Sequence, residues 1–191
     1  MIGKIKHPCL LKDKGRLNLD ELILIFNDMF FASHNVRLEG GAKEPVYLPV
    51  SPDCSINRLI FRSDFISSAL HEVAHWCLAG RLRRRHIDYG YWYNSDERSV
   101  AQQNIFEKVE VKPQALEWIF SIASDNTFNI SIDNLNGNVE SSGYFLKSVS
   151  CQALNWCSEP LPSRAQFFTK ALTYYSGVDP FNRTFYELAT R

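Results

Sequence analysis

The segment that most constrains the fold is residues 65–80, where Glu72 is the one charged side chain apart from two histidines. Apolar residues recur within it at helical spacing, and Gly80 follows as a helix stop. A helix that carries so little charge has no well-solvated face, so it has to be largely buried. The rest of the chain must therefore fold around it and enclose its polar side chains.

This buried helix carries the motif His71-Glu72-Val73-Ala74-His75. Residues four apart lie on one face of a helix, so the imidazoles of His71 and His75 can reach a single metal ion. Glu72 points about 100° further round the helix, where its carboxylate can approach a metal-bound water. Two buried histidines need polar partners, and a metal ion is the simplest partner for both. We therefore expect a metal site on this helix.

A complete metal site needs a third protein ligand, which is usually a carboxylate from another element. Residues 102–118 offer Glu107 and Glu110, which are three residues apart and so share one helix face. Glu110 stands between Val109 and Val111, which predicts that it points into the interior. We expect Glu110 to be the third ligand, with Glu107 as a partner of the ligands or as the substitute for Glu110.

This donor set leaves the reaction open. Two histidines and one carboxylate on zinc, with Glu72 as the general base, describe a metallopeptidase. The same donors on Fe(II), with open positions beside them, describe an oxygenase that binds O2. The five-residue motif alone favours the peptidase. A domain with a purely structural metal is a third alternative, although structural zinc sites more often use cysteine ligands.

Helices outnumber strands along the chain, which predicts an α+β protein. We expect a loosely held tail at residues 1–17 and one domain over residues 18–191, because no Pro- or Ser-rich linker divides the chain. Runs of strand formers predict a small antiparallel sheet at residues 36–38, 46–50 and 58–61, with further strands at 88–93 and 128–132. Helical patterns occupy residues 18–31, 65–79, 100–111, 142–156, 163–175 and 181–189, with another helix starting at Pro113 and running to about residue 123.

Composition excludes several classes of function. The 191 residues carry 21 Lys+Arg against 21 Asp+Glu, which argues against a direct nucleic-acid or membrane-surface binder. An apolar content of 45% excludes intrinsic disorder. No apolar run approaches the roughly 18 residues of a membrane-spanning helix, and the N-terminus shows no secretion signal. The five cysteines include no CxxC pair, which favours reduced thiols and a cytoplasmic location, while the oligomeric state stays open.

Longer blocks of sequence surround the motif. The two most extensive are HEVAHWCLAGRLRRRHIDYGYWY at residues 71–93 and FEKVEVKPQALEW at residues 106–118. Shorter blocks are EPVYLP at 44–49, FNISIDNL at 128–135 and FFTKAL at 167–172. Together they resemble the bacterial elongation factor P hydroxylase family, over roughly residues 19–175.

The resemblance implies a metal-dependent monooxygenase that hydroxylates a lysine of elongation factor P already carrying a β-lysyl-lysine modification. It implies one divalent metal ion, which is expected to be Fe(II), although purified protein could contain zinc. It also implies O2 as co-substrate. A requirement for 2-oxoglutarate is not assumed. His71, His75 and Glu110 match the metal ligands, and Glu72 matches an acid/base or substrate-orienting carboxylate.

The implied substrate suggests further contacts. A β-lysyl-lysine is long and cationic, so its pocket should offer aromatic walls and a carboxylate, for which Tyr91, Trp92 and Asp88 are the candidates. Elongation factor P tends to be acidic, so the resemblance also implies a basic docking surface. The candidates for that surface are Arg81, Arg83, Arg84 and Arg85. Arginines are also favoured at a helix C-terminus by the helix dipole, which is the alternative explanation for this cluster.

Overall fold

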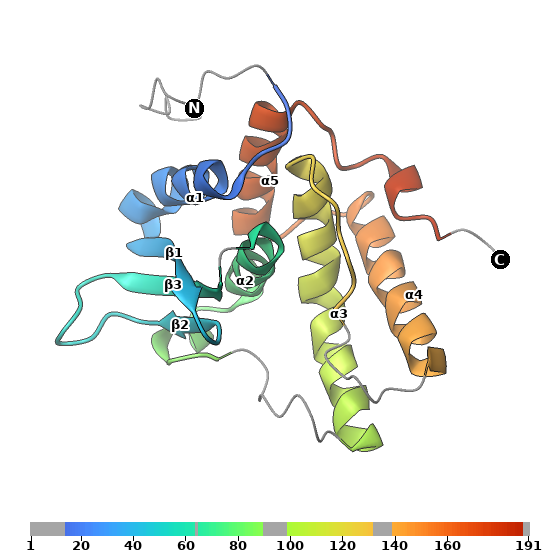
Figure 1. Ribbon diagram of the computed structural model, residues 1–191, viewed down its shortest axis with the longest axis horizontal. Helices are drawn as coiled ribbons and strands as arrows, with labels where there is room; N and C mark the ends of the chain where they lie inside the picture. Colours follow the sequence, from blue (N-terminus) through green and yellow to red (C-terminus); the bar gives the residue numbers. More distant parts are fainter. Residues whose placement is uncertain (1–13, 64, 90–98, 132–138, 189–191) are drawn as a thin grey trace.

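The computed structural model describes residues 14–63, 65–89, 99–131 and 139–188, without the side chains of residue 100 and residues 139–142. The described elements are α1 (Leu19–His34), β1 (Val36–Ala42), β2 (Val46–Leu48), β3 (Asn57–Arg62), α2 (Ile66–Leu78), α3 (Val100–Ala123), α4 (Val139–Trp156) and α5 (Ser163–Ser176), with short 3-10 helices at Arg83–Arg85 and Arg183–Phe185. Figure 1 places the sheet and α1 at one end of the molecule, α3 and α4 at the other, and α2 between them. The prediction of an α+β protein is therefore confirmed.

Helix α1 follows from its sequence almost residue by residue. Asn18 accepts a hydrogen bond from the backbone N–H of Glu21, and the Glu21 side chain accepts one from the backbone N–H of Asn18. This capping box fixes the first turn. At the other end Asn35 adopts the left-handed conformation that stops a helix. The helix buries one apolar stripe, formed by Leu22, Ile25, Phe26 and Phe30.

The sheet is mixed, which corrects the expected antiparallel arrangement. Its order is β1-β3-β2, with β1 parallel and β2 antiparallel to the central strand β3. Strand β2 pairs with one edge of β3, and the chain reverses between them, so this pairing is antiparallel. Strand β1 pairs with the opposite edge of β3 and runs parallel to it. Alternation of apolar and polar residues in short runs predicts strands but carries no information on their direction, because both pairings have the same side-chain period.

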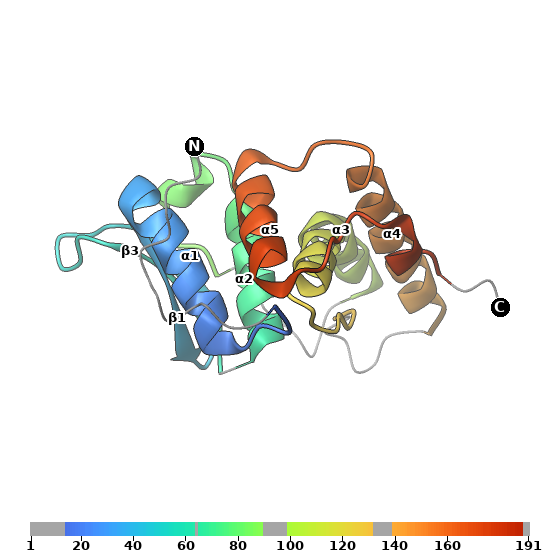
Figure 2. The same ribbon diagram turned by 90° about the horizontal axis from the view of Figure 1, so that it is seen from above.

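Helix α2 lies at the centre of the molecule, as residues 65–80 predict. Ala69, Leu70, Val73 and Ala74 are fully excluded from solvent. Seen from above, α1 and the sheet lie on one side of α2, α3 lies on the other, and α5 passes in front of α2 (Figure 2). The helix contacts β3, α1, α3 and α5. This position carries the motif residues into the interior.

Helix α3 is continuous from Val100 to Ala123, which corrects the prediction that a new helix begins at Pro113. A proline inside a helix removes the hydrogen bond from its own nitrogen to the carbonyl four residues earlier. That carbonyl belongs to Val109, which is 43% exposed, so water can satisfy it. The ring of Pro113 itself is buried. One long helix consequently carries both candidate glutamates, Glu107 and Glu110.

Residues 128–131 form no strand, and their backbone bonds to a side chain instead of to a neighbouring strand. The amide of Gln114 donates to the carbonyl of Ser131 and accepts from its backbone N–H, at 2.7 and 3.1 Å. Phe128 stacks on Trp118, with ring centroids 4.9 Å apart. The prediction of a strand here is wrong because α3 itself supplies the partners of this segment; residue 132 lies outside the described residues.

The predicted helix at residues 181–189 is also wrong for the described part. The structure has only the short turn Arg183–Phe185, followed by the fully buried Tyr186. The Tyr186 hydroxyl donates to the carbonyl of Pro180 at 2.7 Å, and Ser150 donates to the Tyr186 carbonyl at 2.6 Å. These long-range bonds hold the segment in an irregular path.

The described part of the N-terminal tail is attached to the end of α3. Leu17 is buried, its N–H donates to the carbonyl of Ser124, and its own carbonyl accepts from the Asn126 amide. Residues 1–13 of the predicted tail lie outside the described residues. Among the helices that the structure describes, none has the length and apolar character that crossing a membrane requires.

Two arginines bind the free carbonyls at the C-terminal end of α2. Arg164 of α5 donates to the carbonyls of Trp76, Cys77 and Ala79 at 2.6–3.0 Å. Its guanidinium also lies 4.7 Å from the centre of the Trp76 ring. Arg84 donates to the Ala79 carbonyl at 2.6 Å. The helix end is therefore capped by cations, as the macrodipole favours.

We predict that Arg164→Ala lowers the free energy of unfolding by about 2–3 kcal/mol, since it leaves buried carbonyls without a charged donor. Arg164→Lys should recover only part of this loss, because an ammonium cannot reproduce the planar fork of donors. Urea unfolding of the three proteins measures the effect. Lys170→Ala, an exposed residue of the same helix, is the control. Equal stability of Arg164→Ala and this control would contradict the assignment.

Candidate metal centre

Three side chains from two helices converge in the interior. His71 and His75 lie one turn apart on α2, and Glu110 reaches them from α3. The two Nε2 atoms are 3.0 Å apart, and the Glu110 oxygens lie 3.6 Å from His71 Nε2 and 3.4 Å from His75 Nε2. One donor atom from each residue lies within 4.8 Å of the others. This is the arrangement of two imidazoles and a carboxylate that the spacing on two helices predicts.

Glu110 has the properties of a ligand without its cation. The residue is 3% exposed, and its Oε2 atom is buried without a hydrogen-bond partner. Burial raises the pKa of this carboxyl, but the nearby His75, His71 and Arg83 outweigh that effect and lower the pKa below its ordinary value. An ionised, buried oxygen with no donor is costly, and a cation between the three side chains would satisfy it. The residues present therefore fit a metal ion.

His71 has a second carboxylate on its other nitrogen. Its Nδ1 lies 2.8 Å from Oε2 of Glu117, a buried residue two turns after Glu110 on α3. Burial lowers the pKa of His71, but the hydrogen bond and the charge of Glu117, together with Glu110 and Glu72, raise it to about 10. The surroundings of this imidazole are thus strongly negative. The same negative potential favours a bound divalent cation.

Glu72 is buried beside the second histidine. Its pKa is raised, chiefly because burial disfavours the carboxylate, while His75 and His71 oppose that effect. A carboxyl group whose pKa moves up toward neutrality can hold and release a proton near the metal donors. Glu72 is therefore placed to act as an acid or base.

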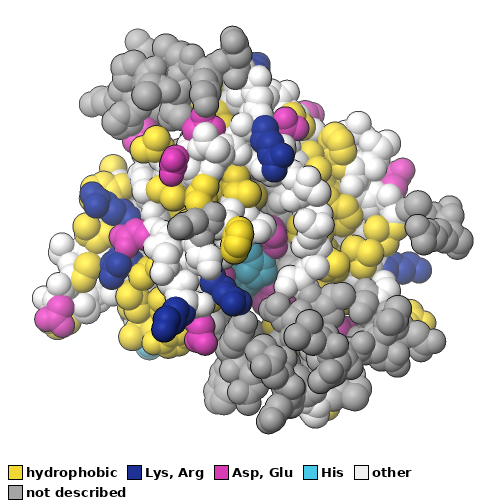
Figure 3. Space-filling model, in the orientation of Figure 1, with side chains coloured by type: hydrophobic (Ala, Val, Ile, Leu, Met, Phe, Trp, Pro, Cys, Tyr) yellow, Lys and Arg dark blue, Asp and Glu magenta, His cyan; other side chains and the backbone are white. Residues whose placement is uncertain are grey.

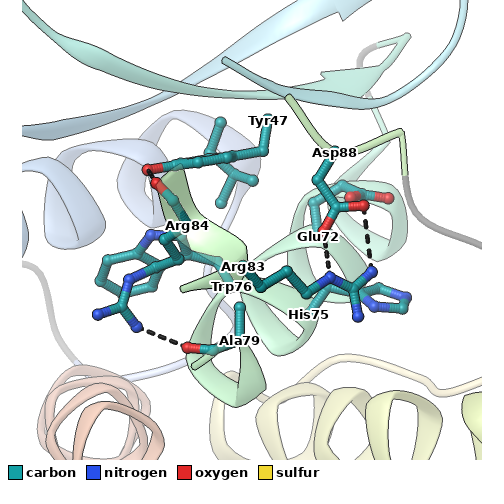
Figure 4. A pocket seen from close by; sticks show the side chains of 9 residues that line it. Tyr47, Glu72, His75, Trp76, Ala79, Arg83, Arg84 and Asp88 are labelled. Atoms are coloured by element: carbon teal, nitrogen blue, oxygen red, sulfur yellow. Dashed lines mark hydrogen bonds and ion pairs between the residues drawn. The ribbon is translucent and has the colours of Figure 1, made fainter. Parts of the chain in front are cut away.

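A small pocket opens beside His75 and Glu72 (Figure 4). The side chains that line it come from the sheet, α2 and the segment after α2: Tyr47, Leu59, Glu72, His75, Trp76, Ala79, Arg83, Arg84 and Asp88. Its volume of about 20 Å³ leaves room for a single water molecule. On the face shown in Figure 3, a histidine side chain is visible between acidic and basic side chains. The side chains of His71 and His75 are 24% and 16% exposed, so these donors can be reached from outside.

Asp88 lies in this pocket and is held in two ways. Its backbone forms an isolated bridge with Tyr47, with N–H to O distances of 2.7 and 3.0 Å. Its carboxylate pairs with the guanidinium of Arg83 (Figure 4). The predicted strand at residues 88–93 is described only to residue 89, where this bridge is its one pairing. Tyr91 and Trp92 lie outside the described residues.

The other candidates are placed apart from the donors. Glu107 is half-buried, accepts a hydrogen bond from the Gln103 amide at 3.1 Å, and does not belong to the group of converging donors. Arg84 caps α2, and its own carbonyl accepts from the Tyr47 hydroxyl at 3.2 Å. Arg81 and Arg85 are exposed. The arginine cluster thus divides into a capping residue, a residue paired with Asp88, and two that face solvent.

Sequence reasoning missed Glu117, although a signal was present. Glu117 follows Glu110 by seven residues, which is close to two full turns and places both on one face of α3. The expected break at Pro113 hid this relation, because two separate helices would share no face. Once α3 is continuous, the two carboxylates meet opposite sides of the same imidazole.

We predict that His71→Ala and His75→Ala abolish binding of Co(II) or Zn(II) while leaving a folded protein. Glu110→Gln should weaken binding far more than Glu107→Gln, because only Glu110 faces both Nε2 atoms. Metal content after dialysis measures binding, and circular dichroism checks the fold. Full metal occupancy in either histidine variant would contradict the site, and the reverse order of the glutamates would identify Glu107 as the ligand.

Comparison with known proteins identifies a family and a named relative. A family model described as elongation factor P hydroxylase matches residues 25–185, which include every donor described above. A protein of Haemophilus influenzae named elongation factor P lysine hydroxylase is 46% identical over 165 residues, which cover 86% of this chain and 93% of that protein. The chain therefore belongs to the elongation factor P hydroxylase family.

Proposed function

We propose that the protein is a metal-dependent monooxygenase that hydroxylates a lysine of elongation factor P already carrying a β-lysyl-lysine modification. We also propose that the catalytic domain comprises residues 18–191 and that the protein is cytoplasmic, as its proposed substrate implies. The observation that carries the proposal is the convergence of the partly buried His71 and His75 with the buried Glu110 in a chain of this family. The name of the Haemophilus influenzae relative supports the choice of substrate.

The metal would be held by His71, His75 and Glu110, with Glu107 as the alternative ligand, and we infer that it is Fe(II), with zinc possible in purified protein. Fe(II) on two histidines and one carboxylate keeps open positions for O2 and supplies the chemistry that oxidises a C–H bond. The chain's own contribution is to fix these donors on two packed helices. Glu72 lines the pocket beside His75 and its burial raises its pKa, so it can take up and release a proton toward substrate or water.

The pocket beside His75 suits a cationic side chain. Asp88 and Glu72 supply carboxylates, and Tyr47 and Trp76 supply aromatic surface. Tyr91 and Trp92 are proposed as further walls. Because Arg83 is paired with Asp88 and the free volume is about 20 Å³, a lysyl chain has to compete with Arg83 for this carboxylate. Binding of the substrate is therefore expected to displace the Arg83 side chain.

The surface around Arg81 and Arg85 is proposed to dock the protein substrate. These two arginines are exposed, and Leu82, Ile87 and Tyr89 beside them are exposed apolar residues. Cations mixed with apolar side chains fit an acidic protein partner. Arg84 contributes to helix capping, so its effect on docking is expected to be indirect.

The proposed activity predicts that the Fe(II)-loaded protein, supplied with O2 and a two-electron reductant, adds one oxygen atom to β-lysylated elongation factor P, while the second oxygen atom of O2 is reduced to water. Intact-mass measurement checks this, with O2 exclusion and the His75→Ala variant as controls. The alternative is a zinc metallopeptidase, which Glu72 beside His75 would also serve. If the zinc form cleaves peptides while the Fe(II) form adds no oxygen under air, the monooxygenase proposal is wrong.

The docking proposal predicts that Arg81→Glu with Arg85→Glu raises the KM for elongation factor P about tenfold, with kcat and metal content unchanged, because rim charges act mainly on association. Lys147→Glu with Lys170→Glu, two exposed lysines on α4 and α5, gives the same change of net charge away from this surface. Steady-state kinetics at two salt concentrations separates the pairs. Equal KM values in the two double variants would show that this surface does not dock the substrate.

A further inference from the structure

We propose that Glu117 is a positioning residue, which holds the imidazole of His71 so that its Nε2 faces the metal position; this rests on the metal site proposed above. The imidazole of His71 lies between two carboxylates of α3. Glu117 Oε2 is 2.8 Å from Nδ1, and Glu110 Oε2 is 3.6 Å from Nε2. The two glutamates are separated by about 10 Å along the helix axis, which is two turns.

Glu117 acts on the side of the ring that faces away from the other donors. The nitrogen that approaches His75 and Glu110 is Nε2, at 3.0 and 3.6 Å, while Glu117 contacts Nδ1. The two nitrogens of an imidazole point in different directions, so one carboxylate on Nδ1 cannot share a metal bound at Nε2. In the part of the chain that the structure describes, the converging donor group comprises only His71, His75 and Glu110.

The contact restricts both the rotation of the ring and the place of its proton. A carboxylate 2.8 Å from Nδ1 favours the tautomer with its proton on Nδ1, and in that tautomer the Nε2 lone pair is available to a metal. A half-turn of the ring about its bond to Cβ would exchange Nδ1 with Cδ2 and Nε2 with Cε1, so it would break this bond and turn a carbon toward the metal position. Glu117 is 5% exposed, so the carboxylate keeps its place inside the helix interface. Helix α3 thus supplies a metal ligand and, two turns later, the group that orients a ligand of α2.

The test is the affinity for Co(II), measured by competition with a chelator. Glu117→Ala is expected to weaken binding about 10–100-fold, as loss of such an outer partner typically does. Glu117→Gln should weaken it less, because its amide oxygen can still accept from Nδ1–H. Lys112→Gln and Lys112→Ala, at an exposed position of the same helix, are the controls and should bind Co(II) like the wild type.

Two further readouts separate positioning from ligation and from a general effect on the fold. The visible Co(II) spectrum of Glu117→Gln should match the wild type, whereas that of Glu110→Gln should change, because only Glu110 is proposed to bind the metal. In the zinc form, the NMR signal of the His71 Nδ1–H should be protected from exchange and should be lost in Glu117→Ala. Unfolding of the metal-free variants shows whether each of them folds. If Glu117→Ala does not fold, the Co(II) affinity of Glu117→Gln is the deciding measurement.

Wild-type Co(II) affinity in both Glu117 variants would overturn the inference, and so would a Glu117→Gln spectrum altered like that of Glu110→Gln. Absence of Co(II) binding by the wild type would overturn it together with the metal site. The proposed substrate fails separately: a protein that binds Co(II) as predicted but adds no oxygen to elongation factor P in its Fe(II) form would leave the role of Glu117 standing.

Discussion

The packing of α2 against α3 places two imidazoles and three carboxylates in the interior, and this interface governs the chemistry of the protein. Removing charges from water costs several kcal/mol per ion unless they are paired. Burial raises the pKa of Glu72, and the carboxylates of Glu110 and Glu117 bring two negative charges next to His71. A divalent cation on neutral imidazoles balances those two charges. The buried side chains are thus mutually compatible when a metal is present.

The remaining elements fix the position of α2. The sheet and α1 cover one side of α2, α3 covers the other, and α5 packs against α1, α2 and α3. Arg164 and Arg84 bind the carbonyls at its C-terminal end, and the chain then turns back so that Asp88 pairs with the backbone of Tyr47. This return brings Asp88 and Arg83 into the pocket beside His75. The sheet is small, but it determines where the wall of the pocket lies.

Local patterns predicted the elements well where a single cause decides them. The apolar spacing of α1 and the uncharged character of α2 both appear in the sequence and lead to the observed helices. The motif spacing and the apolar flanks of Glu110 led to the three converging donors. Prediction was wrong where partners outside the local run of sequence decide: the direction of β1, the bonds of Gln114 to residue 131, and the bond from Ser150 to the Tyr186 carbonyl. Glu117 was missed because Pro113 was taken as the start of a new helix, whereas α3 continues through it.

The proposed chemistry of the protein depends most on one metal ion held between α2 and α3. Anomalous X-ray diffraction from crystals of the Fe(II)-loaded protein, collected at the iron absorption edge, tests this directly. We predict one strong peak that marks an iron ion bonded to His71 Nε2, His75 Nε2 and a carboxylate oxygen of Glu110. Glu117 should lie on the Nδ1 side of His71 and should not be bonded to the metal. A peak elsewhere, or no peak between the two helices in fully loaded protein, would contradict it.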